Sequence, residues 1–298
     1  TYDLLLLATG GRARDPAIPG IDLPSVYTLR TVEDSANIFS QIAIGRRMLV
    51  IGGGWIGLEV AATARAKGME VTVVEAGDRL CARSIPSEIS EFFFFFHSAA
   101  CVSIHFNTSI NSIERESNTL MANIGDARLL ADIIVVGVGL IPNSELAKDA
   151  GLALDNGIVV DERGQTSDAV IYAAGDITNH PNNWIGKRVR LESWANAQNQ
   201  GIAVGRVLSG EEFAYDEIPW FWSDQYDTNL QVIGIPQPEC VNVFRGSVHD
   251  PAFTVFQFLG DRLEAAIAIN NPRDIKLAKR WMKAGKFPPV FALADTQN

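Results

Sequence analysis

The sequence predicts an α/β fold followed by a separate carboxyl-terminal α+β domain. Between residues 31 and 75, helices alternate with apolar strands, which is the βαβ pattern of a parallel sheet with covered faces. An apolar strand that an aspartate opens and a small-residue turn closes occurs twice, at 3–10 and at 132–139. After about residue 212 the chain changes to short β-rich segments with turn residues between them, which is typical of an antiparallel α+β domain.

Local patterns predict the elements in order. Residues 3–8 (DLLLLA) are typical of a buried parallel strand. A helix is expected over 31–43, because the Thr31 hydroxyl can accept an amide hydrogen bond and the acids that follow it favour the positive helix start. We then expect strand 47–51, helix 55–67, strand 70–75, helix 86–98, strands near 102–106, 109–115, 127–130 and 132–137, two strands within 157–176, a helix from about Trp194, the strands CVNVF, FTVFQF and LEAAIAI, and a helix near 272–284.

Composition limits the classes of partner. The net charge of -10 argues against nucleic acid or an anionic membrane as the main partner, since both need a basic face. The longest apolar runs are much shorter than the roughly 20 residues of a membrane helix, and the first residues do not form a secretory signal. We therefore expect no membrane partner and a cytoplasmic location. The cysteines and histidines are scattered without zinc-like spacing, so no metal site is predicted.

A glycine-rich loop joins the strand at 47–51 to the helix at 55–67. Gly52, Gly54 and Gly57 form GxGxxG, in which the first glycine allows a tight turn, the second lets a pyrophosphate approach and the third lets helix and strand pack closely. Phosphate charge then meets the free amides of the helix start. The βαβ unit is therefore predicted to bind a dinucleotide.

Glu75, at the end of the next strand, predicts which dinucleotide is bound. A carboxylate there can accept both ribose hydroxyls of an adenosine and would repel a 2′-phosphate, so NADH is favoured over NADPH. Arg79 lies close enough in sequence to offer a phosphate partner, and Glu75 itself could be a solvated strand-end acid. Two nearby residues have two interpretations each: Glu59 is either a site residue or an acid favoured by the helix dipole, and Trp55 either covers the cofactor or packs on the helix.

A second signature lies at 157–176, where a strand ends in Asp176. An acid at the carboxyl end of a buried strand is where an open α/β sheet binds ligand, although a turn-capping aspartate would look the same. The tryptophans of PWFWSDQY (219–226) could cover a cofactor or belong to a core. Five consecutive phenylalanines at 92–96 break the amphipathic pattern expected of a surface helix.

Several motifs together resemble a known family. TxxxxxYAxGD (Thr166 to Asp176), ATG (8–10), GGGWIGLE (52–59) and GVGLIPN (137–143) are similar to the two-dinucleotide pyridine nucleotide:disulfide oxidoreductase superfamily. LRTVEDS (29–35), ESWANAQNQG (192–201) and PWFWSDQY resemble its putidaredoxin reductase and biphenyl dioxygenase ferredoxin reductase branch.

The resemblance implies FAD and NADH as cofactors and a [2Fe-2S] ferredoxin as the electron acceptor, in an NADH-dependent ferredoxin reductase that is a monomer or weak homodimer. The implied fold is two Rossmann-like dinucleotide-binding domains, the NADH domain being inserted in the FAD domain, plus the α+β domain. The expected boundaries are 1–30 for the first FAD segment, 31–142 for the NADH domain, 143–211 for the second FAD segment and 212–298 for the last domain. The implied site residues are Asp176 on the flavin ribityl chain, Arg30, Thr9 and Gly10 at FAD, Trp194 beside the isoalloxazine, Gly139 in the NADH pocket and Glu59 near the nicotinamide.

One departure from the family is the lack of its amino-terminal glycine loop for the FAD pyrophosphate. The strand at 132–139 follows a glycine loop that begins at Gly52. If the similar strand at 3–10 follows an equivalent loop at a similar spacing, about 75 to 100 residues of the first domain are expected to precede residue 1.

The acceptor surface is predicted from charge. Arg273 to Lys286 holds six basic residues and one acid, and with Lys187, Arg188 and Arg190 it could dock an acidic ferredoxin or simply form a solvated face. The alternatives to a ferredoxin reductase are an NADH oxidase or nitrite-reductase-like flavoprotein, a dithiol reductase, and an NADH-sensing interaction protein resembling apoptosis-inducing factor.

Overall fold

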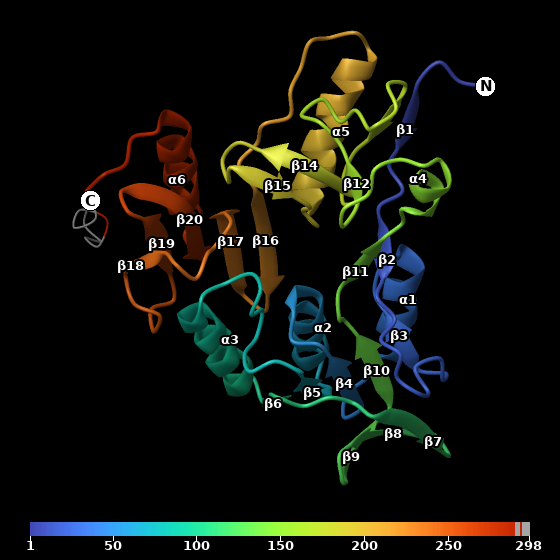
Figure 1. Ribbon diagram of the computed structural model, residues 1–298. Coiled ribbons are helices and arrows are strands. Elements are labelled where there is room, and N and C mark those ends of the chain that lie inside the picture. The colour runs from blue at the N-terminus through green and yellow to red at the C-terminus, as the bar shows by residue number, and fades with distance from the viewer. Residues whose placement is uncertain (290–292, 294–298) are drawn as a thin grey trace.

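The computed structural model describes residues 1–289 and Leu293, which form three regions (Figure 1). The central region is a five-stranded parallel sheet in the order β3-β10-β4-β5-β6. Four of its strands match the sequence-based expectation to within a residue or two. The strands are β3 (Val26–Thr28), β4 (Arg47–Ile51), β5 (Glu70–Val74), β6 (Val102–His105) and β10 (Ile133–Val136).

Helices cover this sheet because its strands are apolar on both faces. All four residues of β10 are buried, as are four of the five in β4. The helices are α1 (Val32–Gln41), α2 (Trp55–Ala66) and α3 (Ser87–Ala99). Thr31 caps α1 as predicted: its side chain accepts a hydrogen bond from the Asp34 amide, and the Asp34 carboxylate accepts one from the Thr31 amide. A small antiparallel sheet, β7 (Ser112–Glu116), β8 (Thr119–Ile124) and β9 (Ala127–Ala131), extends from the same region.

The second region is formed by two segments of the chain, one before and one after the central region in the sequence. Strand β1 (Leu5–Leu7) pairs in parallel with β13 (Ile171–Ala173), and the antiparallel pair β2 (Gly11–Ala13) and β11 (Leu140–Pro142) connects this region to the parallel sheet. Its other elements are α4 (Glu145–Asp149), β12 (Ile158–Val159), β14 (Thr178–Asn182), β15 (Lys187–Val189) and α5 (Trp194–Leu208).

The third region is an antiparallel sheet with one helix. Its strand order is β16-β17-β20-β19-β18, and α6 (Pro272–Ala284) packs on it, spanning the residues expected from the sequence. The strands are β16 (Trp220–Gln225), β17 (Thr228–Gly234), β18 (Val241–Arg245), β19 (Phe253–Leu259) and β20 (Arg262–Ile269). The last residues of the domain expected at 212–298 lie outside the described residues.

The phenylalanine run on α3 (92–96) joins the central and third regions. Helical periodicity turns successive rings toward different neighbours, so the run makes several contacts instead of one apolar stripe. Only Phe95 is mainly exposed, at 57 %. The ring contacts, by centroid distance, are Phe92 with Phe253 (5.4 Å), Phe93 with Trp55 (5.7 Å), Phe94 with Phe106 (5.6 Å) and Phe96 with Tyr226 (5.3 Å).

The boundary expected at residue 31 falls beside β3, which pairs with β10 of the parallel sheet although it precedes that residue. No helix in the described part of the chain is long and apolar enough to cross a membrane.

Candidate functional site

The glycine loop between β4 and α2 is fixed by close backbone packing at two of its three positions. Gly52 has a φ of +106°, and a Cβ there would lie 2.4 Å from the Gly137 carbonyl oxygen. A Cβ on Gly57 would lie 2.0 Å from the Gly52 carbonyl oxygen. A Cβ on Gly54, in contrast, would meet nothing within 4 Å. The loop therefore has open space above Gly54, at the start of α2.

The first turn of α2 has amide groups available for an anion. Gly54 is the N-cap and provides no side-chain hydrogen bond, while the first bond of the helix runs from the Leu58 amide to the Gly54 carbonyl. The first amides of an uncapped helix have no intrahelical partner, and the helix dipole favours negative charge beside them. A pyrophosphate would be stabilised at this position.

Glu75 lies over the glycine loop, where the sequence analysis expected it. Its Oε2 accepts a hydrogen bond from the Gly53 amide at 2.7 Å, and its Oε1 accepts one from the Gly77 amide, also at 2.7 Å. These two bonds orient the carboxylate and leave further lone pairs on both oxygens for donors such as ribose hydroxyls.

Arg79 is not available as a phosphate partner. Its guanidinium donates to the Ile85 and Ala82 carbonyls and to the Ser90 hydroxyl at 2.7 to 2.8 Å. A 2′-phosphate beside Glu75 would therefore meet a carboxylate without this compensating cation.

Gly139 follows β10, and its neighbours include two arginines that the sequence analysis missed. Its φ is +111°, and a Cβ there would lie 3.8 Å from Arg14 Nε and 3.9 Å from Arg83 Nη2. Neither arginine belongs to a motif; the chain brings them to Gly139 through β2 and through the turn before α3. No sequence signal marked them.

Glu59 is half-buried in the second turn of α2 and contacts the third region. The Ser223 hydroxyl of β16 donates to Glu59 Oε1 at 2.6 Å. Burial raises the pKa of Glu59 above its ordinary value; the Ser223 bond opposes this rise, and the nearby Asp224 charge adds to it. Trp55, one helical turn earlier, packs against Phe93 of α3 and Phe221 of β16.

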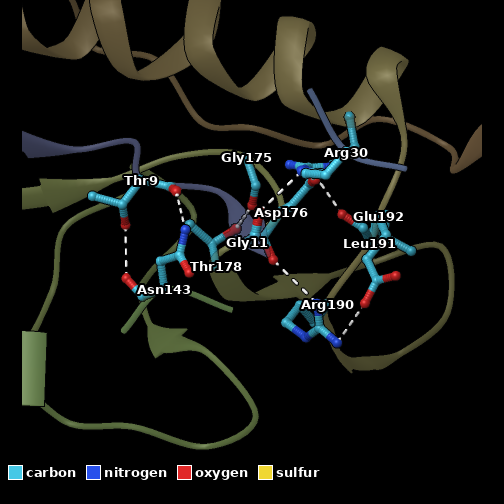
Figure 2. A network of polar contacts seen from close by, with 11 residues as sticks. Thr9, Gly11, Arg30, Asn143, Gly175, Asp176, Thr178, Arg190, Leu191 and Glu192 are labelled. Carbon is cyan, nitrogen blue, oxygen red and sulfur yellow. Dashed lines mark hydrogen bonds and ion pairs between the residues drawn. The ribbon is translucent and has the colours of Figure 1, made fainter. Parts of the chain in front are cut away.

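Arg30 and Asp176 come together at a second site, where the second region meets the segment before α1 (Figure 2). Arg30 Nη2 lies 3.2 Å from Asp176 Oδ2, and Arg30 Nε donates to the Gly11 carbonyl at 2.9 Å. The Asp176 side chain is only 12 % exposed. Burial raises its pKa, while the Arg30 guanidinium opposes the rise. No hydrogen-bond donor among the described residues reaches Asp176 Oδ1.

The ATG turn is hydrogen-bonded to the residue that follows β11, beside this site. The Thr9 hydroxyl donates to the Asn143 carbonyl at 2.8 Å, and the Asn143 amide returns a bond to the Thr9 carbonyl at 2.9 Å (Figure 2). Gly10 has a φ of +57°, and a Cβ there would meet Arg30 Nη2 at 3.2 Å. Thr9, Gly10, Arg30 and Asp176, which are distant in sequence, thus form one cluster.

Trp194 begins α5, and Ser193 caps the helix because its hydroxyl oxygen accepts a hydrogen bond from the Asn196 amide. The Trp194 side chain is 63 % exposed, which is unusual for so large an apolar group. It contacts Trp222 edge-on at 5.9 Å, and Trp222 stacks on Trp220 at 5.0 Å. Tryptophans from two different regions therefore meet at the surface near the start of α5.

The basic residues predicted as a docking surface divide into two groups. Arg188 donates to the Val160 and Asn179 carbonyls, and Arg190 pairs with Glu192 and donates to the Asp176 carbonyl, so these two serve contacts within the molecule. On α6, Lys279 and Lys283 approach Glu217 at 3.3 and 3.6 Å, while the other basic residues of the helix point to solvent. No group of three potential metal ligands occurs among the described residues.

Comparison with known proteins identifies the family. Residues 1–201 match the model of the family described as pyridine nucleotide-disulphide oxidoreductase, and residues 220–298 match the model described as reductase C-terminal. The chain belongs to the pyridine nucleotide-disulphide oxidoreductase family. The resemblance read from the motifs is confirmed, and so is the α/β fold with an antiparallel carboxyl-terminal sheet.

Curated relatives within this oxidoreductase family are similar along nearly the whole chain. Rhodocoxin reductase of Rhodococcus erythropolis is 43 % identical over 290 residues, which is 96 % of this chain and 67 % of the relative. The ferredoxin--NAD(+) reductase component of the anthranilate 1,2-dioxygenase system of Burkholderia cepacia is 42 % identical, over 99 % of this chain and 73 % of that protein.

Solved structures of the family superpose closely. The ferredoxin reductase for the CYP199A2 system from Rhodopseudomonas palustris has a TM-score of 0.95 at 38 % identity and covers 99 % of this chain and 74 % of its own. The reductase in the covalent putidaredoxin reductase-putidaredoxin complex has a TM-score of 0.93 at 37 % identity, covering 99 % and 73 % of the two chains.

Proposed function

We propose that this oxidoreductase transfers hydride from NADH to FAD and then passes single electrons to a [2Fe-2S] ferredoxin that serves an oxygenase system. The observation that carries the proposal is the pairing of two prepared sites: the open glycine loop with Glu75, and the Arg30–Asp176 cluster across the β2–β11 connection. The names of the relatives, which are ferredoxin reductases of oxygenase systems, support the acceptor.

The residues at the glycine loop fit NADH. The space above Gly54 and the free amides of α2 suit the pyrophosphate, and the carboxylate of Glu75 suits the ribose hydroxyls. Since Arg79 is held by its own neighbours, NADH is favoured over NADPH. We assign Gly52, Gly54, Gly57, Glu75 and Gly139 to NADH binding, with Arg14 and Arg83 as further candidates beside Gly139.

The Arg30–Asp176 cluster fits FAD. A nearly buried carboxylate whose Oδ1 lacks a donor among the described residues is suited to accept hydroxyls of a ribityl chain. We assign Thr9, Gly10, Arg30, Asp176 and Trp194 to FAD binding, with Trp194 beside the isoalloxazine.

The bound flavin supplies the step from a two-electron donor to a one-electron acceptor, and the protein provides orientation and electrostatics. Glu59 would lie near the nicotinamide, where its carboxylate would stabilise positive charge on the ring. The amides at the start of α5, together with the helix dipole, would stabilise negative charge at the flavin. Trp194 and Trp222 would exclude water from the reacting rings. No side-chain nucleophile is needed.

The exposed basic residues of α6 and Lys187 are proposed to steer an acidic ferredoxin. Arg188 and Arg190 are left out, because their guanidinium groups make contacts within the protein. We further propose that the enzyme is cytoplasmic and is a monomer or weak homodimer. The domain boundaries are those given above, except that the first is moved to precede β3, which pairs with β10.

The test is to titrate the flavin spectrum of the FAD-loaded protein with NADH and then with a candidate ferredoxin, and to measure ferredoxin-dependent cytochrome c reduction. We expect full bleaching by NADH, reoxidation by ferredoxin and rapid cytochrome c reduction that falls as salt rises. Slow NADH oxidation without transfer to any ferredoxin, accompanied by NADH-dependent dimerisation, would instead favour the sensing protein.

The docking surface needs a matched pair of variants. Lys276→Glu with Arg280→Glu, two exposed residues of α6, should slow ferredoxin reduction and flatten its salt dependence, whereas Lys148→Glu, on exposed α4, should change neither. If the α6 variant behaves like the Lys148 control, the docking surface lies elsewhere.

A further inference from the structure

A chain of buried polar side chains connects Glu59 to α3 by way of β16. The Ser223 hydroxyl donates to Glu59 Oε1 at 2.6 Å, and the Gln225 amide donates to Ser223 Oγ at 3.0 Å. Gln225 Oε1 lies 2.7 Å from His97 Nε2, and the Tyr226 hydroxyl lies 3.4 Å from His97 Nδ1. His97, Gln225 and Ser223 are 0 %, 1 % and 2 % exposed.

The register of β16 on α2 places this chain. Alternate residues of a strand share one face, and on β16 this face carries Phe221, Ser223 and Gln225. Residues four apart on a helix also share a face, so Trp55 and Glu59 of α2 lie one above the other. Phe221 packs on Trp55 and Ser223 bonds to Glu59. The interface between β16 and α2 thus has one apolar contact, Phe221 with Trp55, followed by one polar contact, Ser223 with Glu59.

The hydrogen bonds of the chain all point in one direction. Gln225 Oε1 can only accept, so His97 must donate from Nε2, which leaves Nδ1 to accept from the Tyr226 hydroxyl. Burial lowers the pKa of His97, consistent with a neutral ring. Every donor in the series is therefore directed toward Glu59. The ionised Glu59 carboxylate, which can only accept, receives the last hydrogen bond from Ser223.

We propose that Ser223, Gln225 and His97 are positioning residues for Glu59, which hold its carboxylate ionised and oriented for the nicotinamide. This inference rests on the proposed function, because it takes Glu59 to lie at the bound nicotinamide. This series of hydrogen bonds ends at Glu59 Oε1, and Glu59 Oε2 has no donor in the described part of the protein. Oε2 is therefore the oxygen that would face the cofactor. A domain other than the NADH domain thereby sets the charge at the NADH site.

The charged groups around Glu59 determine the sign of the effect. Asp224, the next residue of β16, disfavours the ionised carboxylate, and the Cys81 thiol, whose pKa is raised by burial, is the other titratable neighbour. A hydroxyl that donates to a carboxylate favours its ionised form. Removing the Ser223 hydroxyl must then raise the pKa of Glu59, and removing the Asp224 charge must lower it.

The test measures NAD⁺ binding by calorimetry and the rate of flavin reduction by NADH, both against pH, on the FAD-loaded protein. For Ser223→Ala we expect the acidic limb of both profiles to move up by about one pH unit, the size of a lost charge-assisted hydrogen bond. Ser223→Thr, which keeps the hydroxyl, should follow the wild type, and Asp224→Asn should move the limb down. Gln225→Leu should shift it in the same direction as Ser223→Ala, by less.

Two further results separate this role from mere packing. Nitrogen NMR of His97 should show a neutral ring protonated at Nε2 at pH 6 in the wild type, and a change of tautomer or exchange in Gln225→Leu. If Ser223→Ala lowers the melting temperature but leaves both acidic limbs in place, the chain is structural and the proposal is wrong. A wild type that neither binds NAD⁺ nor accepts hydride would refute the proposed function itself, which is a distinct outcome.

Discussion

Two glycines of the glycine loop, Gly57 and Gly54, should respond in different ways when each is changed to alanine. At Gly57 the new Cβ would lie 2.0 Å from the Gly52 carbonyl oxygen, about 1 Å inside the closest separation that Cβ atoms show. The start of α2 must then move by about that amount. A displacement of 1 Å in a binding geometry costs about 100-fold in rate. Gly57→Ala should therefore lose both thermal stability and NADH turnover.

Gly54→Ala separates binding from folding. The backbone at Gly54 has a φ of -85°, which any residue adopts, and its Cβ would meet nothing within 4 Å. The melting temperature should stay near the wild-type value, while NADH affinity falls at least tenfold because the methyl group occupies the pyrophosphate space, a loss of about 1.4 kcal/mol.

Gly205→Ala is the matched control for both loop variants. It lies within α5 and also has open space around its Cβ, so alanine should stabilise the helix by about 0.5–1 kcal/mol without affecting NADH. Melting is followed by scanning fluorimetry and affinity by NAD⁺ calorimetry. Unchanged NADH binding in Gly54→Ala would refute the assignment of this loop.

Three further predictions follow from single contacts. Glu75→Ala should raise the KM for NADH about tenfold through lost ribose hydrogen bonds and should not create NADPH activity, which steady-state kinetics with both cofactors will check. Arg245→Met should lower the free energy of unfolding by about 3–5 kcal/mol, because Asp274, 3 % exposed, loses its partner at 2.7 Å; denaturant titration should show much of this recovered when Asp274→Leu is added. Asp176→Asn should raise the melting temperature of the apoprotein at pH 7. The pKa of Asp176 is raised in the folded state, so its charged form is disfavoured there. Arg30, which is half-exposed, keeps its bond to the Gly11 carbonyl in the variant. The difference should close as the pH falls through that raised pKa, and a melting temperature that instead drops at pH 7 would contradict the reasoning.

The elements predicted best from sequence are those whose signals are local. The Thr31 cap, the GxGxxG loop and the apolar strands around it depend on residues a few positions apart, and the structure has them where expected. The hairpin of β16 and β17 was not predicted, because Ser223 and Gln225 interrupt the apolar face that the period-two pattern requires. Those two residues are polar because they meet Glu59 and His97, which lie far away in sequence.

The candidate site was predictable to the same extent. Glu75 and Asp176 end strands, and strand ends are visible in the sequence. Arg14 and Arg83 approach Gly139 from separate segments, and the direction of the Arg79 side chain depends on carbonyls in its own turn. Such contacts arise from tertiary structure, which single-sequence patterns do not record.

The pairing of β1 with β13 has a consequence for the order in which the molecule assembles. Leu5 pairs with Ile171, whereas every strand of the parallel sheet lies between Val26 and Val136 (Figure 1). Contacts between distant segments form late, since the entropy of closing a long loop must be lost before they stabilise anything. Once the inserted sheet has formed, its strands β3 and β10 lie side by side. The β2–β11 pair next to them then brings together the two ends of the segment that separates β1 from β13. We therefore expect the outer domain to close after the inserted sheet has formed.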